Sequence, residues 1–490
     1  MKQITYVGTR DKSIRATASQ AILQGICPDG GLFLPEEMPK MEKSLSELSA
    51  LNYRELAYEV LRLFLIDFTE EELKACIDGA YDEKFDTPEI APVVHQADVS
   101  ILELFHGKTI AFKDMALSIL PYLMKTAAKK NGLEKEIVIL TATSGDTGKA
   151  ALEGFAGVPG VKIIVFFPED GVSPVQKLQM VTQEGENTCV VGIKGNFDDA
   201  QTAVKTLFTD QALQKELDER GYVFSSANSI NIGRLVPQVV YYYWGYLRMA
   251  AQGTISLGDE LVVTVPTGNF GNILAGYFAK QMGLPVKLFI CASNENKVLY
   301  DFFTTGAYDK NRPFIVTSSP SMDILISSNL ERLLCLLVGQ EECKKKMEDL
   351  KHGGRYEMTK LPKDMVGQWA TEEETARAIK EMFAKTGYIL DPHTAVAYAS
   401  YEKYKAETHD KTPALIVSTA SPYKFTKDVM KAIDESYGDA EFFPLMEEME
   451  KKSGVPIPSP IRGIENRPIR HQTVIEKDAI KTFVKDYLCR

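Results

Sequence analysis

Short runs of apolar residues recur along the chain from about residue 100, and stretches with helical spacing separate them. The runs lie at 137–140, 161–168, 261–266, 287–292 and 414–418. Each run is nearly continuous in apolar residues, which is typical of strands in parallel sheets that helices cover on both faces. The pattern therefore predicts the α/β class, with open and mostly parallel sheets.

The first 95 residues show a different pattern. Residues 17–25 predict a short helix ended by glycine, and 45–64 and 69–77 carry apolar residues at helical spacing. Thr69 and Glu72 form a capping box before the last of these. A turn-rich loop covers 28–35. We expect a mainly helical N-terminal block.

Two later segments interrupt the alternation. Residues 331–390 are rich in charged residues and are mostly typical of helix, which indicates a helical insertion or cover. After Glu441 a helical stretch leads to four prolines, and a final helix is expected near 474–487; the prolines are Pro456, Pro458, Pro460 and Pro468. We expect this part to be an extension.

Composition narrows the possible partners. The 490 residues include 56 Lys and Arg against 67 Asp and Glu, a net charge of −11, with no long basic cluster. This argues against nucleic acid or an anionic membrane as the main partner. Seven scattered cysteines without a C-x-x-C pair or a histidine cluster suit reduced thiols rather than disulfides, and no metal site is predicted. The chain lacks both a secretory signal and an apolar run of ~18–20 residues, so we expect a cytoplasmic protein.

The loop 267–272, Thr-Gly-Asn-Phe-Gly-Asn, follows a buried strand and precedes a helix at 273–281. Two glycines three apart let the backbone approach a ligand, and the helix N-terminus adds N–H groups that favour an anion. The loop matches neither the dinucleotide nor the nucleoside-triphosphate fingerprint. The alternative is a tight turn whose glycines serve only geometry.

A second loop, Thr143-Ser144-Gly145-Asp146-Thr147-Gly148, also joins a strand to a helix. Its hydroxyls and backbone N–H groups can hold a carboxylate without a positive charge. The alternative is an N-capping turn in which Thr147 or Asp146 satisfies the first helical N–H groups.

Lys113 follows apolar Ile110-Ala111-Phe112 and precedes an apolar helical stretch, 115–124. A lysine in such surroundings would be partly desolvated, which lowers its pKa and frees the neutral amine for Schiff-base chemistry. The alternative is a surface lysine whose stem packs on apolar neighbours.

Two more segments offer polar groups at turns. Residues 225–234 place Asn228 and Arg234 six residues apart before a helix, a combination that suits a dianionic phosphate. Residues 418–422 end an apolar strand with small hydroxyl side chains, which can offer a neutral hydrogen bond inside a cleft. Each segment is equally compatible with a capped helix or a plain turn.

Taken together and in chain order, these loops and turns resemble the corresponding segments of the threonine synthases, which belong to the fold type II family of pyridoxal-phosphate enzymes. The resemblance runs nearly end to end and includes the separate N-terminal block. It rests on 29–35 (DGGLFLP), 111–114 (AFKD), 143–148 (TSGDTG), 268–272 (GNFGN), 319–323 (SPSMD), 328–332 (SNLER), 391–395 (DPHTA) and the strand end at Thr419.

The resemblance implies a fold with two open α/β domains and an N-terminal block. The implied units are a mainly helical domain over 1–95, a large cofactor-binding domain over 96–135 and 236–430 with the helical insertion at about 331–390, a small α/β domain over 136–235, and a C-terminal extension over 431–490.

The resemblance also assigns roles to residues. Lys113 would be the catalytic residue and would form a Schiff base with pyridoxal 5′-phosphate. Thr419 would face the pyridine nitrogen. A hydroxyl group there, rather than a carboxylate, leaves that nitrogen largely unprotonated, so the cofactor withdraws electrons less strongly. The cofactor phosphate would be held by the backbone of Gly268, Asn269, Phe270, Gly271 and Asn272.

The implied substrate is O-phospho-L-homoserine, which water converts to L-threonine and phosphate. Its phosphate would be held by Asn228 and Arg234 with Lys108, whose spacing to Lys113 fits less securely. Its α-carboxylate would be held by the loop residues Thr143, Ser144, Gly145 and Thr147. We expect a monomer or a homodimer.

One departure concerns Asp146, which stands beside the cofactor where many fold type II relatives have Asn; its role stays open. Two alternative functions remain. A phospho-lyase or a dehydratase of the same fold would use the same cofactor, although a serine or threonine dehydratase has no use for Asn228 and Arg234 as an anion site. A silent, ligand-binding paralogue is disfavoured by the intact Lys113 and glycine-rich loop.

Overall fold

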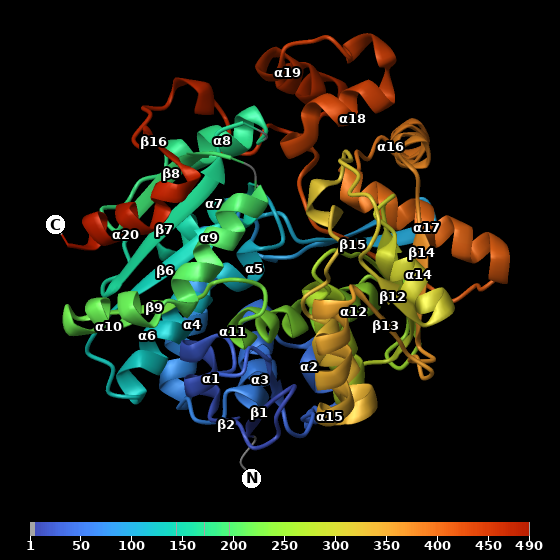
Figure 1. The fold of residues 1–490 in the computed structure, drawn as a ribbon. Helices are drawn as coiled ribbons and strands as arrows, with labels where there is room; N and C mark the ends of the chain where they lie inside the picture. The colour runs from blue at the N-terminus through green and yellow to red at the C-terminus, as the bar shows by residue number, and fades with distance from the viewer. Residues whose placement is uncertain (1–4, 144, 171, 196, 490) are drawn as a thin grey trace.

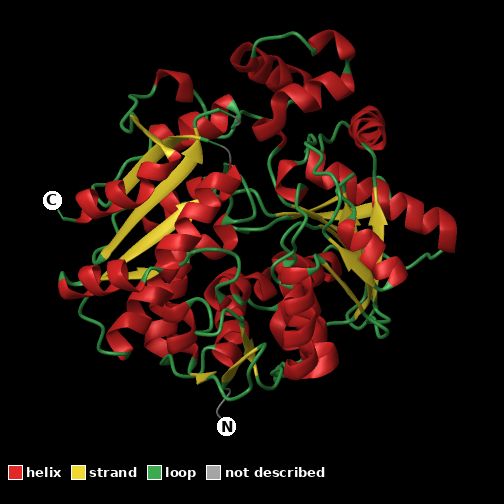
Figure 2. Cartoon of the chain, viewed as in Figure 1, coloured by secondary structure: helices red, strands yellow, loops and turns green. Residues whose placement is uncertain are grey.

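The structure is a computed structural model that describes residues 5–143, 145–170, 172–195 and 197–489. Two groups of parallel strands lie on opposite sides of the molecule, and helices cover both (Figure 2). The N-terminal block lies below them, and α18 and α19 lie at the top (Figure 1). This arrangement confirms the α/β class with two mostly parallel sheets.

The N-terminal block combines helices with a small antiparallel sheet of order β2-β1-β3, which the sequence pattern did not predict. Thr69 caps α4 through a capping box, as the sequence indicates, and the structure shows a second capping box at Thr17, which caps α1. The stretch expected as one helix over 45–64 is two helices, because Asn52 caps the second. The elements are β1 (Tyr6–Gly8), β2 (Arg15–Ala16), α1 (Ala18–Gln24), β3 (Phe33–Pro35), α2 (Leu45–Ser49), α3 (Tyr53–Phe64) and α4 (Glu70–Ala80).

The larger sheet has the order β14-β11-β10-β15-β5-β4, with β4 alone antiparallel to its neighbour. Its strands are β4 (Val93–Gln96), β5 (Val99–Glu103), β10 (Leu261–Pro266), β11 (Val286–Ser293), β14 (Met365–Trp369) and β15 (Ala414–Ser418). The helices around it are α5 (Asp114–Leu117), α11 (Ile232–Leu235), α12 (Pro237–Ala251), α13 (Gly271–Met282), α14 (Val298–Thr305), α15 (Leu330–His352), α16 (Glu372–Thr386), α17 (Pro392–Thr408) and α18 (Thr426–Ile433). α6 (Leu120–Lys130) lies instead on the side of the smaller sheet (Figure 1). β12 (Ala307–Asp309) and β13 (Arg355–Glu357) form a separate pair.

The smaller sheet is entirely parallel, in the order β16-β8-β7-β6-β9. Its strands are β6 (Glu136–Ala142), β7 (Val161–Pro168), β8 (Thr188–Lys194), β9 (Tyr222–Ser225) and β16 (Thr473–Glu476). Its helices are α7 (Asp146–Phe155), α8 (Pro174–Val181), α9 (Phe197–Thr209), α10 (Gln211–Glu219) and α20 (Ile480–Leu488), while α19 (Phe442–Ser453) lies outside the sheet.

Three strands lie where the sequence pattern indicates helix, and one of them, β13, lies within 331–390 and pairs with β12. β14 lies within 331–390 and pairs with β11 in the larger sheet. It was missed because it is an edge strand that is only partly buried, so its residues lack a continuous apolar run. β16 lies within the expected final helix and pairs with β8, so that helix begins only at Ile480. The segment 331–390 is therefore not a purely helical insertion.

The C-terminal extension joins the two halves. It runs from α19, above the larger sheet, to β16 and α20 beside the smaller sheet (Figure 1). On the way, the backbone N–H groups of Arg470 and His471 both donate to the Val181 carbonyl oxygen at the end of α8.

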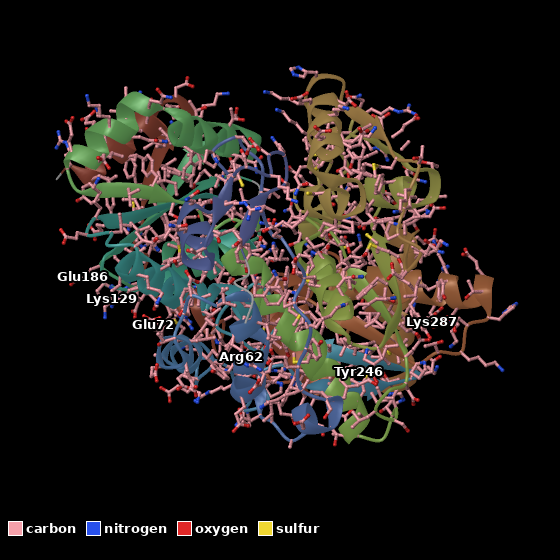
Figure 3. The ribbon with its side chains drawn as sticks, turned by 90° about the horizontal axis from the view of Figure 1, so that it is seen from below. Arg62, Glu72, Lys129, Glu186, Tyr246 and Lys287 are labelled. Atoms are coloured by element: carbon pink, nitrogen blue, oxygen red, sulfur yellow. The ribbon has the colours of Figure 1, made fainter. Side chains whose placement is uncertain are left out.

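The N-terminal block packs against the smaller half through α4 and α6. Lys130, at the end of α6, forms an ion pair of 2.8 Å with Glu72 of α4. Glu72 and the neighbouring Lys129 are labelled at this junction in the view from below (Figure 3). Among the described residues, no helix has the length and apolar character needed to cross a bilayer.

Candidate active site

Lys113 lies between the two sheets because the strand end after β15 holds its backbone. Phe112 donates its N–H to the Thr419 carbonyl oxygen at 2.8 Å, and Ala111 forms a bridge with Ala420. Lys113 then begins α5. The loops after β6, β10 and β15 meet near this point, as expected at the carboxyl ends of parallel strands.

The side chain of Lys113 is only 12% exposed. Its Nζ lies 3.6 Å from Asp146 Oδ2 and 3.5 Å from Ser321 Oγ. Burial is the largest influence and lowers the pKa of Lys113; Asp146 opposes this, whereas the charges of Lys424 and Arg234 lower the pKa further. The amine is therefore more readily deprotonated than that of an exposed lysine.

Asp146, the first residue of α7, is buried and strongly paired. Its Oδ1 lies 2.6 Å from Lys424 Nζ and accepts from Gln176 Nε2 at 2.9 Å, and its Oδ2 accepts from Ser321 Oγ at 3.4 Å. Burial alone would raise the pKa of Asp146, but Lys424 and Lys113 hold that pKa well below its ordinary value. Asp146 is therefore a carboxylate at neutral pH.

Thr143 organises the loop before α7. Its Oγ1 accepts from the N–H groups of Gly145 and Gly148, each at 2.9 Å. Gly145 has φ 146°, and a Cβ there would lie 2.5 Å from the Gln176 side chain, so only glycine fits. Thr143, rather than Thr147 or Asp146, thus provides the helix cap. Ser144 lies outside the described residues, and Thr147 is half-buried.

The loop before α13 has the shape of a cradle. Phe270 adopts a left-handed conformation (φ 64°) at the N-cap of α13. A Cβ on Gly268 would lie 2.4 Å from the Ser321 carbonyl oxygen, so Gly268 lets two loops touch. The carbonyl oxygen of Asn269 accepts from both the N–H and the Nδ2 of Asn329. These contacts hold the first N–H groups of α13 close to Ser321, the residue whose hydroxyl contacts Lys113.

Asn272, in the first turn of α13, carries an unpaired donor. Its Oδ1 accepts from Tyr241 Oη at 2.7 Å and Tyr242 Oη at 2.6 Å. Its buried Nδ2 has no hydrogen-bond partner among the described residues. Since unpaired buried donors are costly, this group fits an anion such as the phosphate of a bound cofactor.

Arg234, in α11, is a buried cation without a counter-ion. It is 3% exposed, and one terminal nitrogen donates to the Ala227 carbonyl oxygen at 2.9 Å. Its Nε has no partner, and no ion pair joins it to a carboxylate within the described part of the chain. Burial lowers the pKa of Arg234 to about 10. A small anion would satisfy this group.

Comparison with known proteins assigns the family. Residues 94–420 match the family described as "Pyridoxal-phosphate dependent enzyme", 5–81 match "Threonine synthase N terminus", and 394–484 match "Threonine synthase, C-terminal". The threonine synthase of Schizosaccharomyces pombe is 37% identical over 90% of this chain and 91% of its own length. The chain belongs to the threonine synthase family. Its fold type II class and its dependence on pyridoxal phosphate follow from this membership.

Solved structures agree with this family. The yeast threonine synthase structure has a TM-score of 0.88 at 32% identity and covers 99% of both chains. The pyridoxal-phosphate-bound threonine synthase of Brucella melitensis has a TM-score of 0.85 at 34% identity, covering 99% of this chain and 98% of that one. The human protein named "Threonine synthase-like 1" is 42% identical over 85% of this chain, which spans only 58% of that protein's length.

For a member of the threonine synthase family, the structure gathers most of the expected site residues. Lys113 and Asp146 are in contact, and the positive charge of Arg234 lowers the pKa of Lys113. Thr419 is buried and bonded to the Lys113 segment. Lys108 is different, because it is exposed at the edge of the site. Asn228 is half-buried in the loop before Arg234.

Sequence reasoning gave no role to three residues that contact Asp146, namely Ser321, Lys424 and Gln176. Ser321 is held in place by His393, whose Nε2 accepts the Ser321 N–H at 3.2 Å. The other ring nitrogen of His393 is bonded to Asp391 Oδ1 at 2.9 Å. Ser321 and His393 stand within the recognised segments 319–323 and 391–395, which could have drawn attention to them. Lys424 and Gln176 had no such signal.

Proposed function

We propose that the protein is a threonine synthase, a carbon–oxygen lyase that converts O-phospho-L-homoserine and water to L-threonine and phosphate. The observation that carries this proposal is Arg234, a buried guanidinium without a carboxylate partner, close enough to Lys113 to influence its charge. A substrate with a phosphate group supplies the missing anion. Membership in the threonine synthase family supports the same conclusion.

The proposed cofactor site has two ends. Asn272 Nδ2 and the backbone N–H groups of the cradle would hold the cofactor phosphate at the N-terminus of α13, and Lys113 Nζ would hold the other end of the cofactor. Thr419 would hold the pyridine nitrogen, and Asp146 would lie beside the ring. The cradle residues are Gly268, Asn269, Phe270, Gly271 and Asn272. When bound, pyridoxal phosphate withdraws electrons from the substrate and so acidifies its Cα–H and Cβ–H bonds.

Lys113 is the proposed general base. Its amine takes the proton from the substrate Cα and later from Cβ, which allows phosphate to leave from Cγ. The Cβ proton would be delivered to Cγ, which becomes the methyl group, so that the Lys113 amine is free again. Water would add its hydroxyl group at Cβ, its second proton would leave with the phosphate, and Cα would regain one proton. The lowered pKa of the amine, caused first by burial, supports this role because it makes the unprotonated form that a base needs more accessible.

The substrate is proposed to lie between two anion sites. Arg234, with Asn228 and Lys108, binds its phosphate, while the loop before α7 binds its α-carboxylate. That loop contributes Thr143, Ser144, Gly145 and Thr147. Because Thr143 Oγ1 already accepts two backbone N–H groups, its own O–H hydrogen remains for donation to the carboxylate.

Comparison of substrates tests this proposal. We expect turnover of O-phospho-L-homoserine, with threonine and phosphate as products, and no comparable turnover of L-serine or L-threonine. Formation of 2-oxobutyrate from O-phospho-L-homoserine would instead indicate a phospho-lyase. Formation of 2-oxobutyrate from L-threonine would indicate a dehydratase.

The proposed setting is the cytoplasm, with a small-molecule substrate and a monomeric or homodimeric enzyme. All seven cysteines, each in the described part of the chain, are free, and six of them are buried. Free thiols are typical of a reducing compartment. The reaction uses none of them.

A further inference from the structure

A fully buried lysine lies on the far side of the carboxylate that faces Lys113. Lys424 belongs to the short 3₁₀ turn η2 (Pro422–Phe425) after β15, and its side chain has no exposed surface. Its Nζ lies 2.6 Å from Asp146 Oδ1 and donates to the Thr109 carbonyl oxygen at 3.0 Å. The other oxygen, Oδ2, lies 3.6 Å from Lys113 Nζ. Two buried amines therefore share one carboxylate.

The geometry decides which amine keeps its proton. Lys424 is closer to Asp146 than Lys113 is, by 2.6 Å against 3.6 Å. Lys424 also has a second acceptor, the Thr109 carbonyl oxygen, which stabilises an ammonium group. Among the described residues, the one further hydrogen-bond partner of Lys113 Nζ is the neutral Ser321 hydroxyl, at 3.5 Å. Asp146 is thus paired more closely with Lys424 than with Lys113.

The groups around Lys113 come from several elements. Asp146 of α7 favours the protonated amine, whereas Lys424 of η2 and Arg234 of α11 oppose it, and each effect appears in the lowered pKa of Lys113 after that of burial. Ser321 and the Phe112 ring are neutral neighbours. Without Lys424, the Asp146 carboxylate would have Lys113 as its nearest cation. A lysine held as an ammonium ion cannot act as a nucleophile or a base.

We propose that Lys424 is a positioning residue that neutralises Asp146 and so leaves Lys113 with an unprotonated amine. This inference rests on the proposed function, because that function is what requires a neutral amine. The pair also joins the two halves of the molecule, since Asp146 begins a helix of the smaller sheet and Lys424 follows a strand of the larger one. A purely structural tie would hold these halves together without changing the charge on Lys113.

The test measures the protonation of Lys113 itself. The full-length chain without cofactor is labelled with trace acetic anhydride across about pH 6 to 11, and mass spectrometry quantifies label on the Lys113 peptide. The variants are K424M, D146N and the double variant. K403M is the matched control, because Lys403 forms an ion pair of the same 2.6 Å with Glu374 away from the site. In the cofactor-loaded protein, the pH midpoint of visible absorbance gives a second readout.

The variants are expected to shift the Lys113 midpoint in opposite directions. K424M leaves Asp146 uncompensated and raises the midpoint by about 1–2 pH units, whereas D146N leaves Lys424 alone and lowers it. The double variant returns the midpoint towards that of the unchanged chain, and K403M does not move it. Since a lone buried charge can destabilise a chain, the double variant, which has neither charge, keeps the comparison possible if K424M does not fold.

The inference is overturned if K424M leaves the pH midpoint of Lys113 labelling unchanged or lowers it. It is also overturned if D146N and the double variant shift this midpoint in the same direction by the same amount, because Lys424 would then have no effect on Lys113. The labelling uses no substrate, so it is independent of the proposed reaction. If threonine is not formed while the shifts keep their predicted signs, the proposed function fails and the charge relationship stands. If threonine is formed without these shifts, only the role of Lys424 fails.

Discussion

Tyr242 donates its phenolic hydrogen to Asn272 Oδ1 at 2.6 Å, and this bond determines which end of the Asn272 amide is free. The neighbouring Tyr241 approaches the same oxygen at 2.7 Å. Burial holds the pKa of both phenols well above its ordinary value, so each keeps one O–H hydrogen; Tyr242 donates to Asn272, whereas Tyr241 also has Gln238 Oε1 as an acceptor at 2.9 Å. The amide nitrogen is consequently left as the unpaired donor at the N-terminus of α13.

Replacing both phenols should weaken cofactor binding. In the variant Y241F/Y242F the Asn272 amide loses the partners that fix its orientation, so we expect the Kd for pyridoxal phosphate to rise about 5- to 20-fold, the equivalent of one or two ordinary hydrogen bonds. Titration of the cofactor-free chain, followed by visible absorbance, measures this. Y243F is the control, since the buried Tyr243 hydroxyl has no partner among the described residues; an equal loss in Y243F would refute the orientation argument.

Arg234 should make the protein responsive to free phosphate. Inorganic phosphate is expected to raise the Tm of the unchanged chain loaded with pyridoxal phosphate, in which the cradle is already filled, because an anion compensates the buried guanidinium. In R234M the response to phosphate disappears, and the KM for O-phospho-L-homoserine rises by roughly 100-fold, as expected for the loss of one or two charge-assisted hydrogen bonds.

The same variant gives an internal control for Arg234. Removing a buried, uncompensated charge should leave the Tm without phosphate unchanged or higher. The visible absorbance of the bound cofactor should also stay unchanged. A large fall in Tm together with loss of the cofactor would show that Arg234 has a structural role instead.

Gly268 should tolerate no side chain. A Cβ would lie 2.4 Å from the Ser321 carbonyl oxygen, so G268A must separate the cradle from the loop that carries Ser321. We expect cofactor affinity to fall at least about tenfold, the equivalent of 1–3 kcal/mol of overpacking. The comparison is G438A, where the nearest atom to a new Cβ is at 3.3 Å and the position is remote from the cradle. Unchanged affinity in G268A would argue against the close contact.

His106 should make stability depend on pH. Its ring nitrogens contact Asp86 at 2.6 Å and Glu103 at 2.9 Å; burial alone would lower the pKa of His106, but these bonds raise it to about 9. Because the folded pKa exceeds the unfolded value of 6.5, this stabilisation is complete below pH 6.5 and is lost as the pH rises to about 9.

Chemical unfolding at several pH values measures this effect. The free energy of unfolding should fall by up to about 3 kcal/mol more in the unchanged chain than in H106Q between about pH 6.5 and 9. H352Q, at an exposed position near the end of α15, should behave like the unchanged chain. Parallel pH profiles for H106Q and the unchanged chain would contradict the account.

The sequence predicts the parts of the site whose chemistry depends on local pattern. The Gly268–Asn272 loop follows a strand and precedes a helix, and Lys113 lies in an apolar segment, so both could be recognised from neighbours in the chain. Lys424 could not, because its burial results from contact with Asp146, which lies far away in the chain. In the fold, β14 and β16 escaped recognition because edge strands are only partly buried or exposed.

The central claim is that Lys113 and its surroundings turn O-phospho-L-homoserine into L-threonine. Its most direct test is the ratio of threonine formed to phosphate released by the purified protein loaded with pyridoxal phosphate, with K113A measured beside it. We predict one threonine for each phosphate, and neither product from K113A. Phosphate released without threonine, or full activity in K113A, would contradict the claim.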